Sequence, residues 1–406
     1  MTTKLPGSTL RAARLLFRLC LVLGIAGNAA MAAERQPFDF LYVSLEGDPA
    51  YRPGRAYTGL VLRDRYAPRA GAESALKEVR IIGRSVGRNF GLKIVPVEDP
   101  SAIVAEVEKA IRGVRSQVIL LDLPLEPFLE TVRAFGRRHD LILFNIRHSG
   151  NSLRGQNCAP ALFHTLPSTR MLTDAIGQYL KSRGWDRILV LAGEGAQDRA
   201  LADGFEQSAG KFGLTIAGRR AFVLSNDPRE REKNNIRLLT GGERYDVIFL
   251  ADTQGEFGRY VPFGSFLARP VVGTEGLVPS AWHWTWERHG APQLNQRFDR
   301  KAKRHMGSED WAAWAAIRSI VEAIVRSGKH DIPSIRAMLT SDAFTFDAYK
   351  GFPANYRSWN NQLRQPILLH THNAVIARAP VEGFLHKDNL LDSLGVDRQE
   401  SRCRFD

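Results

Sequence analysis

The sequence predicts an α/β protein with two doubly wound lobes, each a parallel sheet covered by helices and joined by a multi-segment hinge. The length of 406 residues exceeds one ordinary domain and suits two or three. Short apolar runs alternate with amphipathic stretches, and this alternating pattern occurs in two successive parts of the chain. The composition, 44% hydrophobic and 24% charged, is that of a globular protein with a sizeable core.

The first series of alternating apolar and amphipathic stretches predicts a lobe that starts with a strand at 38–45. The stretch 73–90 carries Leu76, Val79 and Ile82 at helical spacing, so we expect a helix there. The later strands are short and apolar on both faces, which is typical of a parallel sheet between helix layers. Strands are expected at 92–97, 117–121 and 141–145, and helices at 101–112 and 126–138.

The second cycle repeats this pattern after residue 166. Helices are expected at 168–183, 196–212, 227–239 and 255–268, and strands at 187–192, 214–217, 245–251 and 270–274. A helical pair, 293–306 and 311–327, then packs on one lobe or at the seam between the lobes. Two more strands, 366–370 and 374–378, lie in a Pro- and Asn-rich region.

These elements predict a division of the chain into four parts. Residues 1–32 form a signal peptide, and residues 381–406 form a C-terminal tail. The first lobe takes residues 37–165 plus about 270–328, and the second takes residues 166–269 plus about 329–380.

The N-terminus has the features of a Sec signal peptide. An apolar run, 19–26, is too short to span a membrane, and Ala30 and Ala32 are small residues where a signal peptidase would cut. Four cations precede the run without an acid: Lys4, Arg11, Arg14 and Arg18. We expect cleavage after Ala32 and a periplasmic protein; the alternative is a permanent N-terminal anchor.

The formal charge of +13 could suggest a nucleic-acid partner. However, the signal peptide carries four of the positive charges, and the others are interleaved with acids. No basic helix alternates with aromatic residues as a nucleic-acid groove requires. The sequence therefore favours a solvated basic surface and no nucleic-acid partner.

Cleavage would leave two cysteines, Cys158 and Cys403, in an oxidising compartment. An even pair there predicts a disulfide, and the alternative is two unpaired structural thiols. The sequence has no CxxC motif and no Cys/His spacing typical of zinc sites.

Several signatures of catalysis are missing: the sequence has no P-loop, HExxH or full GxGxxG motif. We therefore expect no enzyme, no catalytic residue and no cofactor. His370 and His372 share one face of an expected strand, which suits a metal pair or an exposed polar edge. Trp282, Trp284 and Trp286 alternate similarly and could line a ligand site or cover an interlobe surface.

Acidic residues follow several expected strands, at the edge where open parallel sheets bind ligands. This pattern predicts an acidic cleft that holds a cationic ligand, a hard multivalent cation included. The alternative is that each acid caps a helix or a first turn. The candidate ligand-binding residues are Glu46, Asp48, Asp122, Asp252, Thr253, Glu275 and Trp282.

Two sets of segments resemble known families. The connection Phe163-His-Thr-Leu-Pro-Ser168 and the turn Val271-Val-Gly-Thr-Glu-Gly276 resemble the type I periplasmic binding fold of branched-chain amino acid receptors. Asn157-Cys158 and the segments 357–369 and 383–403 resemble the ABC-transporter substrate-binding proteins associated with PQQ-dependent alcohol dehydrogenase systems.

The resemblance implies a monomeric periplasmic receptor that closes around a small ligand and delivers it to an inner-membrane permease and ATPase. Glu275 matches the glutamate that holds a ligand ammonium in amino acid receptors. The turns at 122–124 and 145–148 lack the hydroxyls that bind the ligand carboxylate there, which disfavours an ordinary α-amino acid. Alternatives are a sensor or accessory protein for alcohol oxidation, and a protein that binds Ca²⁺ or a lanthanide.

Overall fold

The computed structural model describes residue 2 and residues 35–55, 59–63, 65–114, 117–225 and 227–405. The predicted signal segment lies outside these ranges except for residue 2. None of the helices in the described ranges has the length and hydropathy that a membrane span requires.

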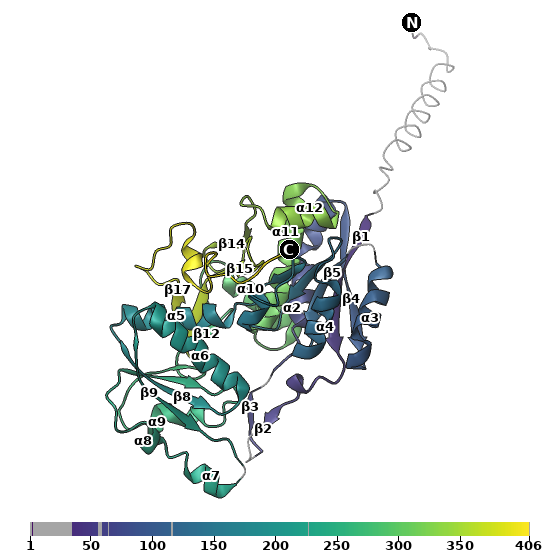
Figure 1. The fold of residues 1–406 in the computed structure, drawn as a ribbon. Coiled ribbons are helices and arrows are strands. Elements are labelled where there is room, and N and C mark those ends of the chain that lie inside the picture. The colour runs from purple at the N-terminus through teal and green to yellow at the C-terminus, as the bar shows by residue number, and fades with distance from the viewer. Residues whose placement is uncertain are drawn as a thin grey trace.

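The first lobe is built on a five-stranded sheet in the order β4–β1–β5–β6–β7, and all its neighbouring strands run parallel (Figure 1). Every side chain of β5 and β6 is buried, which confirms the predicted burial on both faces. The strands are β1 (Gln36–Leu45), β4 (Arg88–Val97), β5 (Val118–Asp122), β6 (Ile142–Asn145) and β7 (Leu162–His164).

Helices cover both faces of this sheet because successive residues of β1 point to opposite sides. Phe40 and Tyr42 share a core with one helix layer, while Leu41 and Val43 share a core with the other. The first layer contains α2 (Arg69–Ser85), α10 (Ala291–Ala302), α11 (Ser308–Ser327) and α12 (Ile332–Leu339), and the second α3 (Ile103–Arg112) and α4 (Leu125–Phe135).

A close contact between α2 and α11 depends on Gly71. A Cβ atom at this position would lie 1.9 Å from the backbone oxygen of Asp310, so only glycine allows the two backbones to approach. The pair 293–306 and 311–327, expected on one lobe or at the seam, therefore packs on the first lobe as α10 and α11.

The second lobe has a four-stranded parallel sheet in the order β11–β10–β8–β9. Helices α5 (Thr169–Ser182) and α6 (Ala196–Lys211) cover one face, where Phe205 stacks on Phe249 at a ring distance of 3.8 Å. The strands are β8 (Arg187–Gly193), β9 (Thr215–Phe222), β10 (Val247–Ala251) and β11 (Val271–Gly273).

The opposite face of this sheet carries short helices where the sequence pattern predicted two long ones. The predicted helix 227–239 is two short helices, α7 (Pro228–Glu232) and α8 (Ile236–Leu239), because Asn235 caps α8 through the N–H of Leu238. The predicted helix 255–268 is reduced to a 3₁₀ turn and α9 (Val261–Gly264). Its first residues instead donate their N–H groups to Asp252.

A small antiparallel sheet, β12–β16–β17, joins the lobes. Alternation along its central strand places Leu368 in the core of the first lobe, and Ile367 and Leu369 in that of the second. Its strands are β12 (Val278–Ser280), β16 (Ile367–His370) and β17 (Val375–Ala379). A second small sheet has β13 (Phe346–Asp347), β14 (Pro353–Tyr356) and β15 (Leu363–Arg364), and β2 (Gly54–Arg55) and β3 (Val61–Arg63) form a hairpin.

The lobe boundaries in the structure differ from the expected ones in two places. Strand β11, expected in the first lobe, pairs with β10 because its apolar residues Val271 and Val272 complete the second sheet. Helix α12 and the strands β13–β15, expected in the second lobe, bury Ile335, Phe346 and Tyr356 in the first core.

The C-terminal segment runs from the second lobe back to the first. Asp392 in this segment is buried and accepts from Arg357 and Arg364, each at 2.8 Å. The backbone N–H of Gly395 donates to Asp174 of α5 at 2.8 Å. Cys403 and Cys158 form a disulfide with an S–S distance of 2.03 Å, which agrees with the pairing expected from the sequence.

Candidate functional site

A cavity of about 470 Å³ lies between the two lobes. One side is the segment that follows β1 and includes the β2–β3 hairpin, which extends from the first lobe toward the second (Figure 1). The other side is the start of α6 and the loop after β10. The lining residues are Pro49, Ala50, Arg52, Gly54, Arg55, Leu62, Arg65, Gly195, Ala196, Gln197, Asp198, Thr253, Gln254 and Glu256.

The cavity lies at the carboxyl ends of three parallel strands. β1 ends at Leu45, β8 at Gly193 and β10 at Ala251, and the loops after all three strands line the cavity. This is the edge where open α/β sheets bind ligands. The cavity therefore lies at the sheet edge where the sequence analysis expects a ligand.

The charged side chains of the lining differ from the acidic cleft that the sequence predicted. Three arginines, Arg52, Arg55 and Arg65, face two acids, Asp198 and Glu256. Asp198 is buried and already accepts the backbone N–H of Thr253 at 2.7 Å. The lining thus offers more cationic than anionic groups to a ligand.

The arginines retain donors for a ligand. Arg52 donates to the carbonyl of Gly47 at 3.3 Å, and Arg55 donates to that of Gly59 at 3.0 Å. A guanidinium has five N–H groups, so each of these contacts uses only part of its capacity.

Of the seven predicted ligand-binding residues, only Thr253 lines this cavity. Asp122 and Asp48 belong to a buried cluster beneath the first-lobe loop. Asp122 accepts from the hydroxyls of Tyr42, at 2.6 Å, and Tyr51, and Arg147 lies 2.6 Å from Asp48 and 3.4 Å from Asp122. Burial raises the pKa of Asp122 and of both tyrosines, so the hydroxyls remain donors.

Asp252 organises the turn after β10, as the capping alternative expects. Its carboxylate accepts the N–H groups of Gly255, Phe257 and Gly258 at 2.8, 3.0 and 2.7 Å. The side chain of Glu275 lies beside this turn, since a Cβ atom on Gly258 would be 3.1 Å from its Cγ. Glu46 is exposed at the end of β1, where its N–H donates to Val97 at 2.8 Å.

Trp282 lies in the core of the first lobe, so the aromatic wall expected from the tryptophan pattern does not form in the cavity. It is 2% exposed, its indole N–H donates to Asn295 at 2.9 Å, and it stacks on Trp311. β12 ends at Ser280, so strand alternation does not extend to the tryptophans. Trp286 is also buried, and Trp284 stacks on His305.

Two histidines near the hinge pack against each other. The rings of His283 and His370 stack at 3.8 Å, and burial with the neighbouring histidines lowers the pKa of His283 to about 3. Across the described parts of the chain, there is no group of three or more His, Cys, Asp or Glu residues that could hold a metal ion.

The buried carboxyl of Asp122 predicts a pH dependence of stability. Burial raises its pKa above the ordinary value of 3.8, so the folded protein binds this proton at a higher pH than the unfolded chain. Its contribution to stability therefore increases as the pH falls through the folded pKa.

Urea titrations at several pH values test this prediction. We expect the free energy of unfolding of wild type to increase relative to that of Asp122→Asn as the pH falls. A difference in unfolding free energy between wild type and Asp122→Asn that stays constant with pH would contradict this prediction. Asp388→Asn, a change at an exposed carboxylate, is the control.

Sequence reasoning missed the arginines of the cavity. The predicted residues come immediately after the strands, whereas Arg52, Arg55 and Arg65 lie in the long connection between β1 and α2. The signal that could have found them is the Pro53-Gly54 pair, because such a pair marks an irregular connection, and the first strand of the hairpin begins at Gly54.

Residues 69–228 match a family model described as periplasmic binding protein. No curated protein matches the sequence. A leucine-, isoleucine-, valine-, threonine- and alanine-binding protein from Brucella ovis in its closed conformation is similar in structure. Its TM-score is 0.63 at 15% identity, over 82% of this chain and 89% of the other.

Two further solved structures are similar. A branched-chain amino acid ABC transporter ligand-binding protein from Burkholderia xenovorans LB400 has a TM-score of 0.65 at 12% identity, over 84% of this chain and 95% of the other. An ABC transporter solute-binding protein from R. palustris in complex with benzoate has a TM-score of 0.60 at 13% identity, over 90% and 99%. The two parallel sheets and these matches show that the chain has the fold of the type I periplasmic binding proteins.

Proposed function

We propose that this chain is a periplasmic solute-binding protein of an ABC transporter and that it binds a small carboxylate-bearing solute in the interlobe cavity. The observation that carries the proposal is the lining, which combines Arg52, Arg55 and Arg65 from one lobe with the start of α6 from the other. A ligand that touches both sides would favour the closed arrangement of the lobes.

The chemistry of the lining suits a carboxylate. An arginine binds a carboxylate through two parallel N–H···O bonds, and such charge-assisted bonds are stronger than neutral ones. The first residues of α6, Ala196 and Gln197, also face the cavity, and the positive end of a helix dipole favours an anion. The amides of Gln197 and Gln254 can bind other polar groups of the solute.

Similar proteins add support to this ligand class. The relative from Brucella ovis is a receptor for leucine, isoleucine, valine, threonine and alanine, and the one from R. palustris is in complex with benzoate. All these ligands carry a carboxylate but differ in the rest of the molecule. We therefore propose that the cavity recognises the carboxylate, and the proposal covers amino acids and other carboxylate-bearing solutes alike.

Native mass spectrometry of protein purified from its own periplasm identifies the solute, and calorimetry then measures its affinity for variants. We expect Arg55→Gln to weaken binding by about 10- to 100-fold, because a hydrogen bond to a charged group contributes about 1.5–3 kcal/mol. Arg80→Gln, an exposed change on α2, should leave the affinity unchanged. Equal affinity of both variants and wild type would contradict a carboxylate site in this cavity.

Closure of the lobes is a second expected result. Saturating solute should lower the radius of gyration in small-angle scattering, because ligand contacts from both lobes shift the population toward the closed state. An unchanged radius with a bound solute, in a protein that is already closed when free, would contradict the receptor mechanism.

A narrower proposal links the protein to PQQ-dependent alcohol oxidation and rests only on the resemblance of Asn157-Cys158 and the segments 357–369 and 383–403. Loss of solute uptake in a strain that lacks the gene would support transport. Normal uptake with a lost response to alcohol would favour a sensor or accessory role instead. A Ca²⁺ or lanthanide ligand has less support, because Asp122 and Asp252 are engaged by protein donors.

A further inference from the structure

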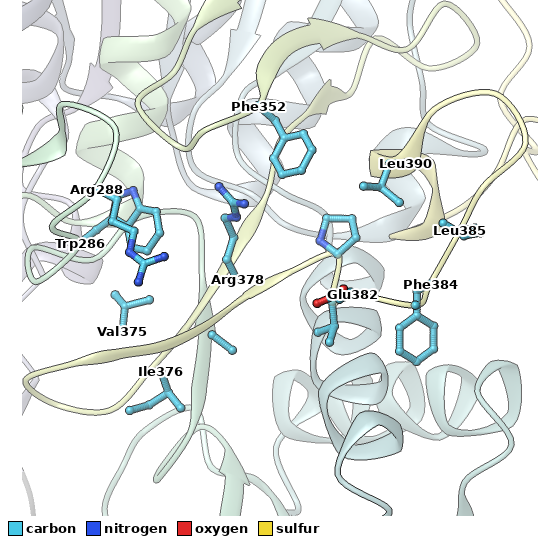
Figure 2. A pocket seen from close by; sticks show the side chains of 14 residues that line it. Trp286, Arg288, Phe352, Val375, Ile376, Arg378, Glu382, Phe384, Leu385 and Leu390 are labelled. Carbon is cyan, nitrogen blue, oxygen red and sulfur yellow. The ribbon is translucent and has the colours of Figure 1, made fainter.

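A second cavity, of about 510 Å³, lies at the hinge and shares no lining residue with the interlobe cavity. Figure 2 shows its labelled side chains, which come from first-lobe segments, from β17 and from the C-terminal tail. Trp286 and Phe352 come from first-lobe segments, whereas Val381 packs against the second core. Phe384 meets Phe212 of the second lobe edge-on at 5.4 Å.

One part of this hinge cavity carries two guanidinium groups, those of Arg288 and Arg378. The guanidinium of Arg378 lies 4.7 Å from the centre of the Phe352 ring, and its Nη1 donates to the carbonyl of Lys350 at 2.7 Å. In Figure 2, Arg378 extends toward Phe352, and Arg288 lies beside Trp286.

These two arginines have no anionic partner within the described ranges, where neither forms an ion pair. Burial lowers the pKa of Arg378, and repulsion by the positive charge of Arg288 adds to this effect. An anion between or beside them would relieve this repulsion. Glu382, the acidic residue of the lining, is exposed and makes no ion pair with either arginine.

The rest of the hinge cavity is apolar. Phe384, Leu385 and Leu390 line the side formed by the tail, and Val375 and Ile376 line the side formed by β17. Leu385 is 86% exposed and Ile376 is 48% exposed, so these side chains leave apolar area uncovered. An apolar side next to a cationic side suits a ligand with a flat apolar body and one anionic group.

We propose that the hinge cavity is a second binding site, which takes a small aromatic anion with its acidic group at Arg288 and Arg378 and its ring among Phe352, Phe384 and Leu385. The volume of about 510 Å³ lies within the range of sites for small organic molecules. Aromatic side chains supply faces and edges for a ring, and guanidinium groups supply paired donors for a carboxylate or sulfonate.

A pair of fluorescent probes tests the proposal. 1-Anilinonaphthalene-8-sulfonate has the aromatic body and the anionic group, and N-phenyl-1-naphthylamine has the same rings without the charge. We expect the sulfonate to bind one site at least 10-fold more tightly than the neutral amine. Arg288→Gln should remove most of this preference, because each charged hydrogen bond is worth about 10-fold or more in affinity.

Matched variants distinguish this site from the interlobe cavity. Arg288 is exposed, and its backbone carbonyl accepts from the N–H of Ala291, a contact that does not involve its side chain, so Arg288→Gln should fold normally. Leu385→Asn should weaken the binding of both probes, whereas Arg55→Gln should leave the binding of both unchanged. The proposal is overturned if the two probes bind equally, if Arg288→Gln binds the sulfonate as wild type does, or if Arg55→Gln alone abolishes its binding.

Discussion

Replacing Cys158 and Cys403 together by serine should lower the free energy of unfolding by about 5 kcal/mol, because the disulfide closes a long loop and restricts the unfolded chain. The bond spans a sequence separation of 245 residues. It also fixes the end of the tail to the first lobe, and Cys403 is buried. Guanidinium denaturation followed by circular dichroism measures the difference.

Reduction provides the control for this substitution. Wild type treated with dithiothreitol should unfold at the lower denaturant concentration of the double variant, and the double variant should not respond to the reagent. Equal midpoints for oxidised wild type and the double variant would show that the bond does not stabilise the protein. Two free thiols in unreduced periplasmic material would show that it does not form there.

Asp392→Asn should lower the free energy of unfolding by about 3–5 kcal/mol, because it leaves a buried guanidinium without its counter-charge. Arg357 is 1% exposed, and its side chain lies among the carbonyls of Leu391 and Leu394 and the carboxylate of Asp392. Arg364 donates to the same carboxylate at 2.8 and 2.9 Å. One substitution therefore removes the partner of two cations.

Asp388→Asn is the matched control, since Asp388 is exposed in the same segment. Its effect on the free energy of unfolding should stay within about 0.5 kcal/mol. If Asp392→Asn and Asp388→Asn changed the free energy of unfolding by similar amounts, the buried Arg357–Asp392 pair would contribute no more to stability than an exposed carboxylate does.

The sheets could be predicted from the sequence because their signal is local. Runs such as 118–121 are buried on both faces, and apolar continuity over a few residues is enough to identify them. The prediction of a helix at 255–268 was wrong because three backbone N–H groups donate to the carboxylate of Asp252. The periodicity of apolar residues carries no information about such hydrogen bonds. A single side chain with several backbone partners can replace a helix by a turn.

The candidate site was harder to predict because its charges are decided by contacts between distant segments. Asp122 has the position of a ligand-binding acid, yet its partners Tyr42 and Tyr51 come from 80 and 71 residues earlier in the chain. Whether a carboxylate faces a ligand or a tyrosine depends on that packing. The location of the cavity could be predicted from strand ends, but its charge could not.

The interleaved hinge also has a consequence for how the protein is made. Leu368 completes the first core, and Ile367, Leu369 and Leu394 belong to the second, so neither core is whole while these residues are still in the ribosome. At the usual rate of ~5–20 residues per second, the interval from Phe38 to Leu394 takes roughly 20–70 s of synthesis. During that time each core lacks part of its final set of apolar residues. We expect the nascent chain to be a good client for holding chaperones, and a fragment that stops before β16 to aggregate instead of forming one stable lobe.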